Sequence, residues 1–464
     1  MCGLNPDSLP SPLLALCRAV SEAGGQAWLV GGCVRDLLLG ILPKDYDLEV
    51  YWLELDTLQQ IAGYHGRVEH VGRHFGVLKC WTGGLEIDLA LPRTERKSGR
   101  GHCGFDITSN PHISPETASL RRDFTINAMM YNPLDGSFLD FHDGKNDLEN
   151  KQLKHVSSAF SQDPLRPLRA MQFAARFDLT LDVNTARLCQ SLLAESDSLP
   201  PERVWGEWKK WSHAAYPSAG LRALKASGWL SLYPELATLS DCPQDAHWHP
   251  EGDVWTHTLQ VCDQAARIAA RNKLDHTTSE HLLFAALCHD LGKPATTITT
   301  ESNQIRSPGH SEAGIQPTKT LLKKVGAPAQ LFEHIRPLIL EHITHLHGEP
   351  THRAVRRLAH RLEPANIELW EMLVEADASG RSPAPVSRPA LAWLQQAETL
   401  HSHLNRPGPV LTGRMLIEMG VSPGPAMGEL LGKAYEAQLD GEIEDEDSAR
   451  LWYRKHAADD NTQG

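Results

Sequence analysis

The sequence lacks the features that would direct a protein into a membrane or hold it together with disulfides. Its 464 residues contain no run of 18 apolar residues, so no membrane-spanning helix is expected. The amino-terminal segment lacks the basic-then-apolar order of a signal peptide. Nine cysteines are present, but none forms a C-x-x-C pair, which argues against a zinc ribbon and a disulfide framework. We therefore expect a cytoplasmic protein with reduced thiols.

The chain also lacks a net positive charge, which proteins that bind nucleic acid commonly carry. The formal net charge is −13 at pH 7, although the distribution of charge matters more than its sum. Residues 151–229 carry 11 Lys and Arg against 7 Asp and Glu, whereas Glu442–Asp447 holds five acids in six positions. Taken alone, each run is best interpreted as a solvated face.

The chain is too long for one compact core, and its pattern changes along its length. Residues 27–92 alternate short β-rich runs with helix-like stretches and predict a small α/β or α+β head. A helix is predicted over 33–40, ended by Gly40, and strands are predicted over 27–30, 45–52, 76–81 and 85–91. Residues 93–118 are polar and rich in Gly, Ser, Pro and Thr, which predicts a long flexible loop.

From about residue 150 onward the pattern is helical. Residues 164–177 and 201–211 place apolar side chains at three- and four-residue spacing. Residues 245–380 are also helical in pattern and unusually rich in histidine, and a proline-rich stretch at 382–390 predicts a linker or helix break. A final helical unit is predicted over about 391–455, and there are no repeats.

Two aspartates in the head predict a metal site. Asp45 and Asp47 lie two apart in a predicted strand, so their side chains point to the same face. Asp88, in the neighbouring predicted strand, is placed to supply a third carboxylate. An all-oxygen ligand set suits Mg²⁺, and two such ions activate an attacking hydroxyl and neutralise a leaving pyrophosphate. A D-x-D pair alone is more simply interpreted as a solvated strand end.

A paired glycine lies close to these aspartates in the sequence. Gly31 and Gly32 follow a predicted strand and precede a predicted helix, and glycine lets the backbone approach a ligand closely. Backbone N–H groups at the helix start favour phosphate, and Arg35 is a candidate bidentate phosphate donor. The simpler interpretation is a tight turn, but the glycine pair, the charged helix start and the D-x-D pair together favour a nucleotide site.

These residues resemble a known signature. Gly31–Gly32, Val34–Asp36, Gly40, Lys44–Asp45 and Asp47 resemble the signature of class II tRNA nucleotidyltransferases and bacterial poly(A) polymerases, in the DNA polymerase β-like nucleotidyltransferase superfamily. Five further segments resemble, in order, that family's flexible loop, ribose-recognition motif, hinge, base-selecting helix and supporting helix: 93–99, 121–128, 139–148, 162–177 and 201–207.

The resemblance implies roles for individual side chains. The ribose would be recognised through its 2′-OH by Arg122, Asp123 and Asn127. The base would be read on its Watson–Crick edge by Asp163, Arg166 and Arg169, which share a face if they lie on one helix. For the arginines, phosphate contact or helix solvation is the simpler interpretation. The family's base-selecting helix usually opens with Glu-Asp, whereas this one opens with Gln162–Asp163.

The histidine-rich middle of the chain resembles an HD phosphohydrolase domain. The segments that carry the resemblance are 247–259, 282–294, 309–314, 338–345 and 374–381, and the resemblance implies metal ligands at His257, His289, Asp290 and Asp377. Imidazole with carboxylate suits Mg²⁺, Mn²⁺, Ni²⁺ or Fe. His310, His342 and Lys293 are candidates to bind phosphate or to extend the site. Any one histidine alone is better interpreted as structural.

The sequence thus predicts an α+β protein in four parts. They are a polymerase β-like nucleotidyltransferase head (1–150), an all-α neck and body (151–240), an α-helical HD domain (241–385) and a helical tail (386–464). Residues 410–443 in the tail resemble a segment that the family associates with the tRNA body, and a helical cap on the HD domain is an equal alternative.

The predicted function is template-independent addition of CCA to the 3′ end of tRNA from CTP and ATP, with Mg²⁺ in the head. Several bacterial CCA-adding enzymes carry an HD domain with metal-dependent phosphatase and 2′,3′-cyclic phosphodiesterase activity, so the same is expected here. The closest alternative is a poly(A) polymerase or an enzyme that adds only A. A nucleotide hydrolase or signalling protein that works through its HD domain is a second alternative, and a non-catalytic RNA-binding module is a third.

Overall fold

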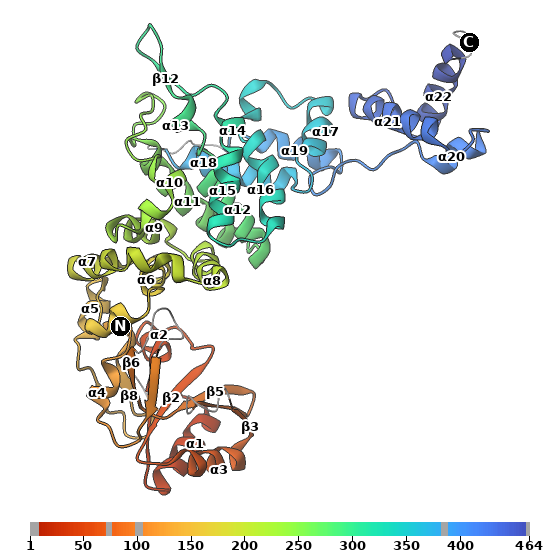
Figure 1. Cartoon of the computed structure of the whole chain (residues 1–464). Helices are drawn as coiled ribbons and strands as arrows, with labels where there is room; N and C mark the ends of the chain where they lie inside the picture. The colour runs from red at the N-terminus through yellow and green to blue at the C-terminus, as the bar shows by residue number, and fades with distance from the viewer. Residues whose placement is uncertain (1–8, 71–76, 98–104, 382–387, 461–464) are drawn as a thin grey trace. The chain divides into compact units, whose positions relative to one another are not determined.

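The computed structural model describes residues 9–70, 77–97, 105–381 and 388–460 (Figure 1). The chain divides into two compact units. Unit 1 comprises Met1–Trp211 and Ala219–Leu232, and unit 2 comprises Ser212–Ser218 and Tyr233–Gly464. The four-part division expected from the sequence is finer than this one and stays a prediction.

A curled seven-stranded sheet forms the head of unit 1, with strand order β3-β4-β5-β2-β1-β8-β9. The pairs are antiparallel except for β2 and β5, which run parallel. The strands are β1 (Gln26–Val30), β2 (Tyr46–Tyr51), β3 (Arg67–His70), β4 (Val77–Thr82), β5 (Leu85–Ala90), β8 (Met130–Tyr131) and β9 (Phe138–Leu139). The strands expected in the head from the sequence are therefore confirmed, each to within one or two residues.

Three helices accompany the first strands of the head. Helix α1 (Ser11–Glu22) packs against α3 (Leu55–His65), and α2 (Gly32–Leu38) directly follows β1. Leu13, Leu16 and Val20 of α1 are fully buried because they recur at three- and four-residue spacing. Helix α2 begins after Gly31 and ends before Gly40, as the sequence indicates.

The predicted long loop at 93–118 is wrong. The structure has an antiparallel hairpin there, β6 (Arg93–Lys97) with β7 (Phe105–Ser109), followed by helix α4 (Pro115–Ser119). The Ser114 hydroxyl accepts from the Thr117 backbone N–H and caps that helix. The polar composition of this region concealed the strands, because β6 contains no apolar residue whose spacing could indicate a strand. Residues 98 and 99 of the expected flexible loop lie outside the described residues.

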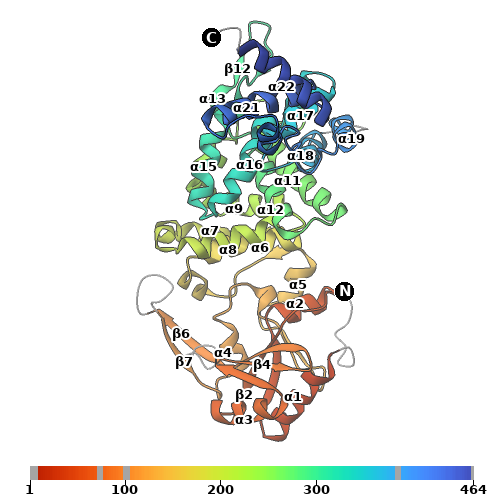
Figure 2. The same cartoon turned by 90° about the vertical axis from the view of Figure 1, so that its right-hand side faces the viewer.

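The remainder of unit 1 is helical and confirms the predicted change of class after residue 150. Helices α6, α7 and α8 follow the sheet as a helical layer (Figures 1 and 2). Its core contains the fully buried Trp208, Trp211 and Trp229. Its helices are α5 (Gly144–Glu149), α6 (Arg166–Phe177), α7 (Val183–Ser191), α8 (Pro201–Ser212) and α9 (Pro217–Ala226), with short 3₁₀ segments η2 (Thr125–Asn127) and η3 (Ser158–Gln162).

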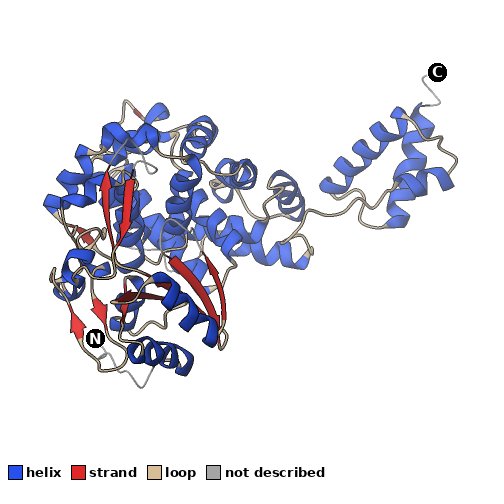
Figure 3. Ribbon diagram, turned by 60° about the horizontal axis from the view of Figure 1, so that its bottom comes forward, coloured by secondary structure: helices blue, strands red, loops and turns tan. Residues whose placement is uncertain are grey.

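Unit 2 is built almost wholly of helices (Figure 3). Helix α11 (Val254–Arg271) contacts both α12 (His276–Cys288) and α18 (Ile367–Ser379), and α16 (Ala329–Glu341) contacts α12 and α18. Asp253 and Asp275 begin α11 and α12 by accepting from backbone N–H groups of the first turn. No helix in the described parts of the chain is long and apolar enough to cross a membrane.

The segment 391–455 is helical, as the sequence predicts, and its separation as a unit of its own stays a prediction. It contains α19 (Leu391–Thr399), α20 (Gly413–Glu418), α21 (Pro425–Asp440) and α22 (Glu446–Asp460). A small core of its own includes Met415, Leu416 and Trp452. Helix α17 (His352–Arg361) holds α21 through Arg353 and Arg357, which both bind Asp440.

The cysteines that the structure describes form no disulfide and are all buried. They are Cys17, Cys33, Cys80, Cys189, Cys242, Cys262 and Cys288. Burial raises the pKa of the Cys33 and Cys288 thiols to about 12, so both are protonated at neutral pH.

A buried ion-pair network gives the first prediction. Glu371 on α18 is fully buried, and its carboxylate is bound by Arg388, which also lies 3.2 Å from Glu375. Removing Arg388 leaves an uncompensated buried charge, so Arg388→Ala should lower the free energy of unfolding of unit 2 by about 3 kcal/mol. Urea unfolding measures the loss. The control is Arg406→Ala, because Arg406 pairs with Glu363 at the surface, where a loss under about 1 kcal/mol is expected. Equal losses for the two variants would contradict the interpretation.

Candidate functional site

The register between β2 and β5 brings the head carboxylates together. These strands are parallel, and Asp47 is directly opposite Asp88, so both side chains leave the same face of the sheet. Asp45 lies one residue before β2 begins, not inside the strand as expected. The pKa of Asp47 is raised, chiefly by partial desolvation although much of the side chain stays solvent-accessible, and the charges of Asp88 and Asp45 raise it further against the opposing effect of Arg122. The carboxylates are thus close enough to repel one another.

Clustered carboxylates of this kind fit a divalent cation. The Asp88 Oδ1 atom is buried and accepts no hydrogen bond among the described residues, although Lys79 Nζ lies 3.6 Å away. Desolvation and the charges of Glu86 and Asp45 raise the pKa of Asp88. A bound Mg²⁺ would relieve this repulsion and give the free oxygen a partner.

Gly31 lies beside these carboxylates. Its φ of +74° is in the left-handed region, and a Cβ added there would lie 3.6 Å from Asp47 Oδ2 and 3.2 Å from Arg122 Nη1. The backbone at the start of α2 is therefore open to a ligand that also reaches Asp47 and Arg122. The sequence predicted this closeness of the glycine pair to the D-x-D pair, and the geometry agrees for Asp47.

Arg35 does not occupy the position expected of a phosphate donor. Its side chain is 3% exposed, with Nε and Nη2 bound to Asp36 Oδ1 and Nη1 bound to the amide oxygen of Asn127. Its guanidinium lies 4.3 Å from the Phe177 ring centroid. The orientation of α2 directs Arg35 toward α6 and not toward the carboxylates, so its contacts are with the protein itself.

Of the three predicted ribose residues, Asp123 and Asn127 form one network with α6, whereas Arg122 lies apart from it, beside Gly31 and Glu49. Arg169 donates through Nε and Nη2 to Asp123 Oδ2, at 2.9 and 2.6 Å, and the Asn127 amide donates to Asp123 Oδ1 at 3.1 Å. Burial alone would raise the pKa of Asp123, but Arg169 and Asn127 lower it. Together with the contact between Arg35 and Asn127, this network joins α2, η2 and α6.

The role of Glu49 was not predicted from the sequence. This residue is 1% exposed on β2, two positions after Asp47. It lies 2.8 Å from Arg121 Nη2 and 3.5 Å from Arg122 Nη2. Although burial would raise the pKa of Glu49, the two arginines lower it, so an ionised Glu49 holds Arg122 beside Gly31. Alternation places Glu49 on the same face of β2 as the exposed Asp47, so the pattern did not indicate its burial.

The prediction that Asp163, Arg166 and Arg169 share one helical face is wrong. Asp163 precedes α6 and has extended backbone, because Pro164 follows it. Its Oδ2 accepts from Arg203 Nη2 on α8 at 3.0 Å. Arg166 is 8% exposed and donates to the backbone carbonyls of Ala159 and Arg121. Arg203 was not singled out from the sequence, although the segment that carries it was.

In unit 2 the expected metal ligands converge. His257 of α11, His289 directly after α12 and Asp377 of α18 offer ligand atoms that all lie within 4.8 Å of one another, and all three residues are buried. The fourth, Asp290, places Oδ2 at 3.1 Å from His289 Nε2. Burial opposes ionisation, yet the surrounding histidines hold the pKa of both Asp290 and Asp377 well below the usual range.

Hydrogen bonds at Nδ1 aim the histidines at a common point. His257 Nδ1 donates to Glu251 Oε1 at 2.8 Å, and His289 Nδ1 donates to the Ala286 carbonyl at 2.8 Å. Each bond leaves Nε2 for a ligand. Among the described residues, His289 Nε2 is a buried atom with no hydrogen-bond partner. The donor set of imidazole and carboxylate therefore fits a divalent transition metal or Mg²⁺.

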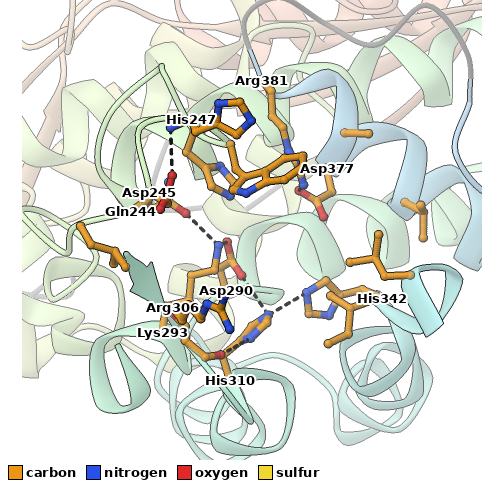
Figure 4. A pocket seen from close by; sticks show the side chains of 18 of the residues that line it. Gln244, Asp245, His247, Asp290, Lys293, Arg306, His310, His342, Asp377 and Arg381 are labelled. Carbon is orange, nitrogen blue, oxygen red and sulfur yellow. Dashed lines mark hydrogen bonds and ion pairs between the residues drawn. The ribbon is translucent and has the colours of Figure 1, made fainter. Parts of the chain in front are cut away.

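A cavity of about 720 Å³ opens over this group (Figure 4). Asp290, Asp377, His310 and His342 line it, together with the cationic side chains Lys293, Arg306 and Arg381 and the aromatic Trp248. Lys293 Nζ lies 2.7 Å from Asp290 Oδ2. Burial and the nearby His289 lower the pKa of His342 to about 3, so this imidazole is neutral. A group of candidate metal ligands beneath cationic side chains is suited to binding a phosphate ester.

Comparison with known proteins decides the family. The model of the poly(A) polymerase head domain matches residues 27–154, and that of the HD domain matches residues 254–376. A multifunctional CCA protein of Xanthomonas oryzae pv. oryzae is 37% identical over 423 residues, covering 89% of this chain and 97% of its own. That of Aliivibrio salmonicida is 37% identical over 77% of this chain and 86% of its own. The chain belongs to the multifunctional CCA protein family.

Solved structures support the fold of this CCA protein family member. The Bacillus stearothermophilus CCA-adding enzyme in complex with CTP superposes with a TM-score of 0.66 at 20% identity, covering 98% of this chain and 100% of the other. The Thermotoga maritima CCA-adding enzyme complexed with tRNA gives a TM-score of 0.61 at 19% identity, covering 97% and 96%. The expected combination of nucleotidyltransferase head and HD domain is thus confirmed.

The contact of Glu251 with His257 gives the second prediction. In this CCA protein family member the carboxylate fixes the His257 tautomer, so Glu251→Gln should weaken divalent metal binding in unit 2 by about 10- to 100-fold. Equilibrium dialysis with Ni²⁺, which favours imidazole over an all-carboxylate site, measures the affinity. Glu312→Gln is the control, because Glu312 is exposed and belongs to none of the metal-ligating groups found. An unchanged Ni²⁺ affinity in Glu251→Gln would refute this role.

Proposed function

We propose that the chain adds C, C and A to the 3′ end of tRNA, using CTP and ATP and releasing pyrophosphate. The observation that carries the proposal is the register that sets Asp47 opposite Asp88, beside the open backbone of Gly31 and the side chain of Arg122. The relatives are named multifunctional CCA proteins, and solved neighbours are CCA-adding enzymes in complexes with CTP, ATP and tRNA. Because tRNA, CTP and ATP are cytosolic, the enzyme would work in the cytoplasm.

In this mechanism Asp45, Asp47 and Asp88 would hold Mg²⁺, which when bound activates the RNA 3′-OH and neutralises charge on the leaving pyrophosphate. Arg122, fixed by Glu49, would bind the triphosphate next to the backbone of Gly31 and Gly32. Catalysis would then rest on positioning and on charge neutralisation. Arg35 would act at one remove, because it holds Asn127 in place.

Recognition of the ribose and base would fall to the network on α6 and α8. Asp123 and Asn127 would bind the ribose next to Arg169. Asp163 and Arg203 form a pair that offers one acceptor and several donors, which suits the Watson–Crick edge of a base. Arg166 would support them through its bonds to the backbone.

For unit 2 we propose a metal-dependent phosphohydrolase, acting as a phosphatase or a 2′,3′-cyclic phosphodiesterase. His257, His289, Asp290 and Asp377 would hold Mg²⁺, Mn²⁺ or Ni²⁺, which when bound polarises the phosphate and activates water. Lys293 and Arg306 in the cavity would bind the phosphate oxygens. The HD domain would repair damaged tRNA ends before they are extended.

The third prediction separates the two activities. Asp47→Asn removes a metal ligand of the head and should lower nucleotide addition at least about 100-fold. Asp290→Ala should leave addition unchanged, because Asp290 belongs to the cavity of unit 2. The assay supplies CTP and ATP to tRNAs that end before the first C, the second C or the A, and sequences the products. Failure to incorporate from CTP alone would favour poly(A) polymerase or A-only addition, and loss of addition in folded Asp290→Ala would refute the division of labour.

The fourth prediction concerns the choice between CTP and ATP. Arg203→Ala removes the partner of Asp163, so discrimination against the wrong base should fall by about 10-fold or more, measured as a ratio of kcat/KM values. The control is Arg187→Ala, because Arg187 bonds only to Asn184 on its own helix among the hydrogen bonds of the described residues. An equal loss of kcat/KM with both nucleotides would assign Arg203 to phosphate or RNA binding instead.

A further inference from the structure

A large aromatic side chain is exposed at the cavity of unit 2. Trp248 lines this cavity and is 63% exposed, whereas Trp370, also in unit 2, is fully buried. Leu346 lines the same cavity and is 68% exposed. A single exposed apolar side chain needs no explanation. Two of them in one cavity with cationic side chains indicate a ligand that has both a charged and an apolar part.

A short turn fixes the position of Trp248. Asp245 Oδ1 accepts from the backbone N–H of His247 at 3.0 Å. The Asp245 carbonyl accepts from the backbone N–H groups of Trp248 and His249, at 3.1 and 2.8 Å. The His247 ring meets the indole edge to face, with the ring centroids 4.9 Å apart and the planes at 83°. The indole is therefore in place before a ligand arrives, which lowers the entropic cost of binding.

Both ends of this turn are tied to side chains at the base of the cavity. Before the turn, Gln244 Oε1 accepts from Lys293 Nζ at 2.8 Å. After it, His249 Nδ1 lies 2.9 Å from Glu251 Oε1, the atom that also accepts from His257 Nδ1. The same turn therefore sets the position of the indole relative to Lys293, which is proposed above to bind phosphate.

The cavity has room for more than a phosphate group. Its volume of about 720 Å³ lies within the range of sites that hold whole small molecules, about 300 to 1,000 Å³. In Figure 4, His247 lies toward the top of the view and Lys293 toward the bottom, with Asp290 between them. The turn that carries Trp248 and the side chain of Lys293 thus belong to separate parts of one cavity. The base and the phosphate of a nucleotide are likewise separated, by the ribose.

We propose that Trp248 stacks on the base of a nucleoside phosphate ester whose phosphate is bound by Lys293 and Arg306, and that Leu346 contributes to the same base site. The proposal rests on the proposed phosphohydrolase function and specifies which residues select its substrate. Every base has a π face that can stack on an indole. The site would therefore favour esters that carry a base over esters that lack one, without choosing between bases.

The experiment compares two esters that differ only in the base. The full-length chain, supplied with Ni²⁺, hydrolyses adenosine 2′,3′-cyclic phosphate or the 2,3-cyclic phosphate of methyl riboside, and KM and kcat are measured for each. Trp248→Ala should raise KM for the adenosine ester about 10-fold with little change in kcat, because the stacking contact is lost. Both constants for the ester without a base should stay unchanged. Trp248→Phe keeps an aromatic ring and should restore most of the affinity.

Trp52→Ala is the matched control, because Trp52 is also exposed and also contacts a histidine ring, that of His112, but belongs to unit 1. It should change neither ester's KM. Circular dichroism verifies folding of each variant. An equal rise in KM for both esters in Trp248→Ala, or no rise for either, would overturn the base site and leave the proposed phosphohydrolase intact.

A binding measurement keeps the two proposals separate. Calorimetry with adenosine 2′-monophosphate, which needs no turnover, should show about 10-fold weaker binding to Trp248→Ala than to the parent chain. If the parent chain hydrolysed neither ester, the phosphohydrolase would be overturned, and this measurement would still decide the role of Trp248.

The ester can be a free nucleotide or the end of an RNA, and a tRNA that ends in a 2′,3′-cyclic phosphate distinguishes the two. A loss in Trp248→Ala with this tRNA as well as with the mononucleotide would assign the site to the terminal nucleotide of RNA. A loss with the mononucleotide alone would assign it to free nucleotides. A loss with neither would refute stacking.

Discussion

The candidate site of the head depends on repulsion among carboxylates that the sheet holds close together. The parallel pairing of β2 and β5 sets Asp47 opposite Asp88, with Asp45 one residue before β2 begins. The strand register leaves these carboxylates little freedom to separate; desolvation raises the pKa of Asp47 and Asp88, and neighbouring carboxylates raise it further. The buried Glu49 lies on the same strand and holds Arg121 and Arg122 in place beside these carboxylates. Negative charge is thus concentrated at one place on the head.

Rigid connections extend from this face into the helical layer of unit 1. Arg35 of α2 binds Asn127, Asn127 binds Asp123, and Asp123 binds Arg169 of α6. Each member of this series is at least partly buried, and each is held by a charge-assisted or amide hydrogen bond. A site that reads bases without a nucleic-acid template needs its donors and acceptors fixed, because pre-organised groups discriminate better than mobile ones. The network fixes its own donors and acceptors with side chains of the protein alone.

The sequence predicted the elements well and the pairings of side chains poorly. Strands β1, β2, β4 and β5, the helix between Gly31 and Gly40 and the convergence of His257, His289 and Asp377 followed from local pattern and from the family resemblance. The hairpin at β6 and β7 did not, because β6 consists of polar residues alone. The pairing of Asp163 with Arg203 spans 40 residues and depends on how α6 and α8 pack, which no local spacing encodes. The prediction that Arg35 faces a phosphate failed for the same reason. The side chain instead points to Phe173 and Phe177, which lie far along the chain.

A buried cysteine in each unit can report how often the structure around it opens locally. Cys33 donates to the Val30 carbonyl next to the turn at Gly31 in the head, and Cys288 immediately precedes His289 and Asp290 in unit 2. Both thiols are buried, so an alkylating reagent such as iodoacetamide can reach either one only when the surrounding structure opens. The rate at which each is modified therefore measures the free energy of local opening at the two centres separately. If a ligand stabilises one centre, the alkylation rate of the cysteine there should fall, and no engineered reporter is needed to measure it.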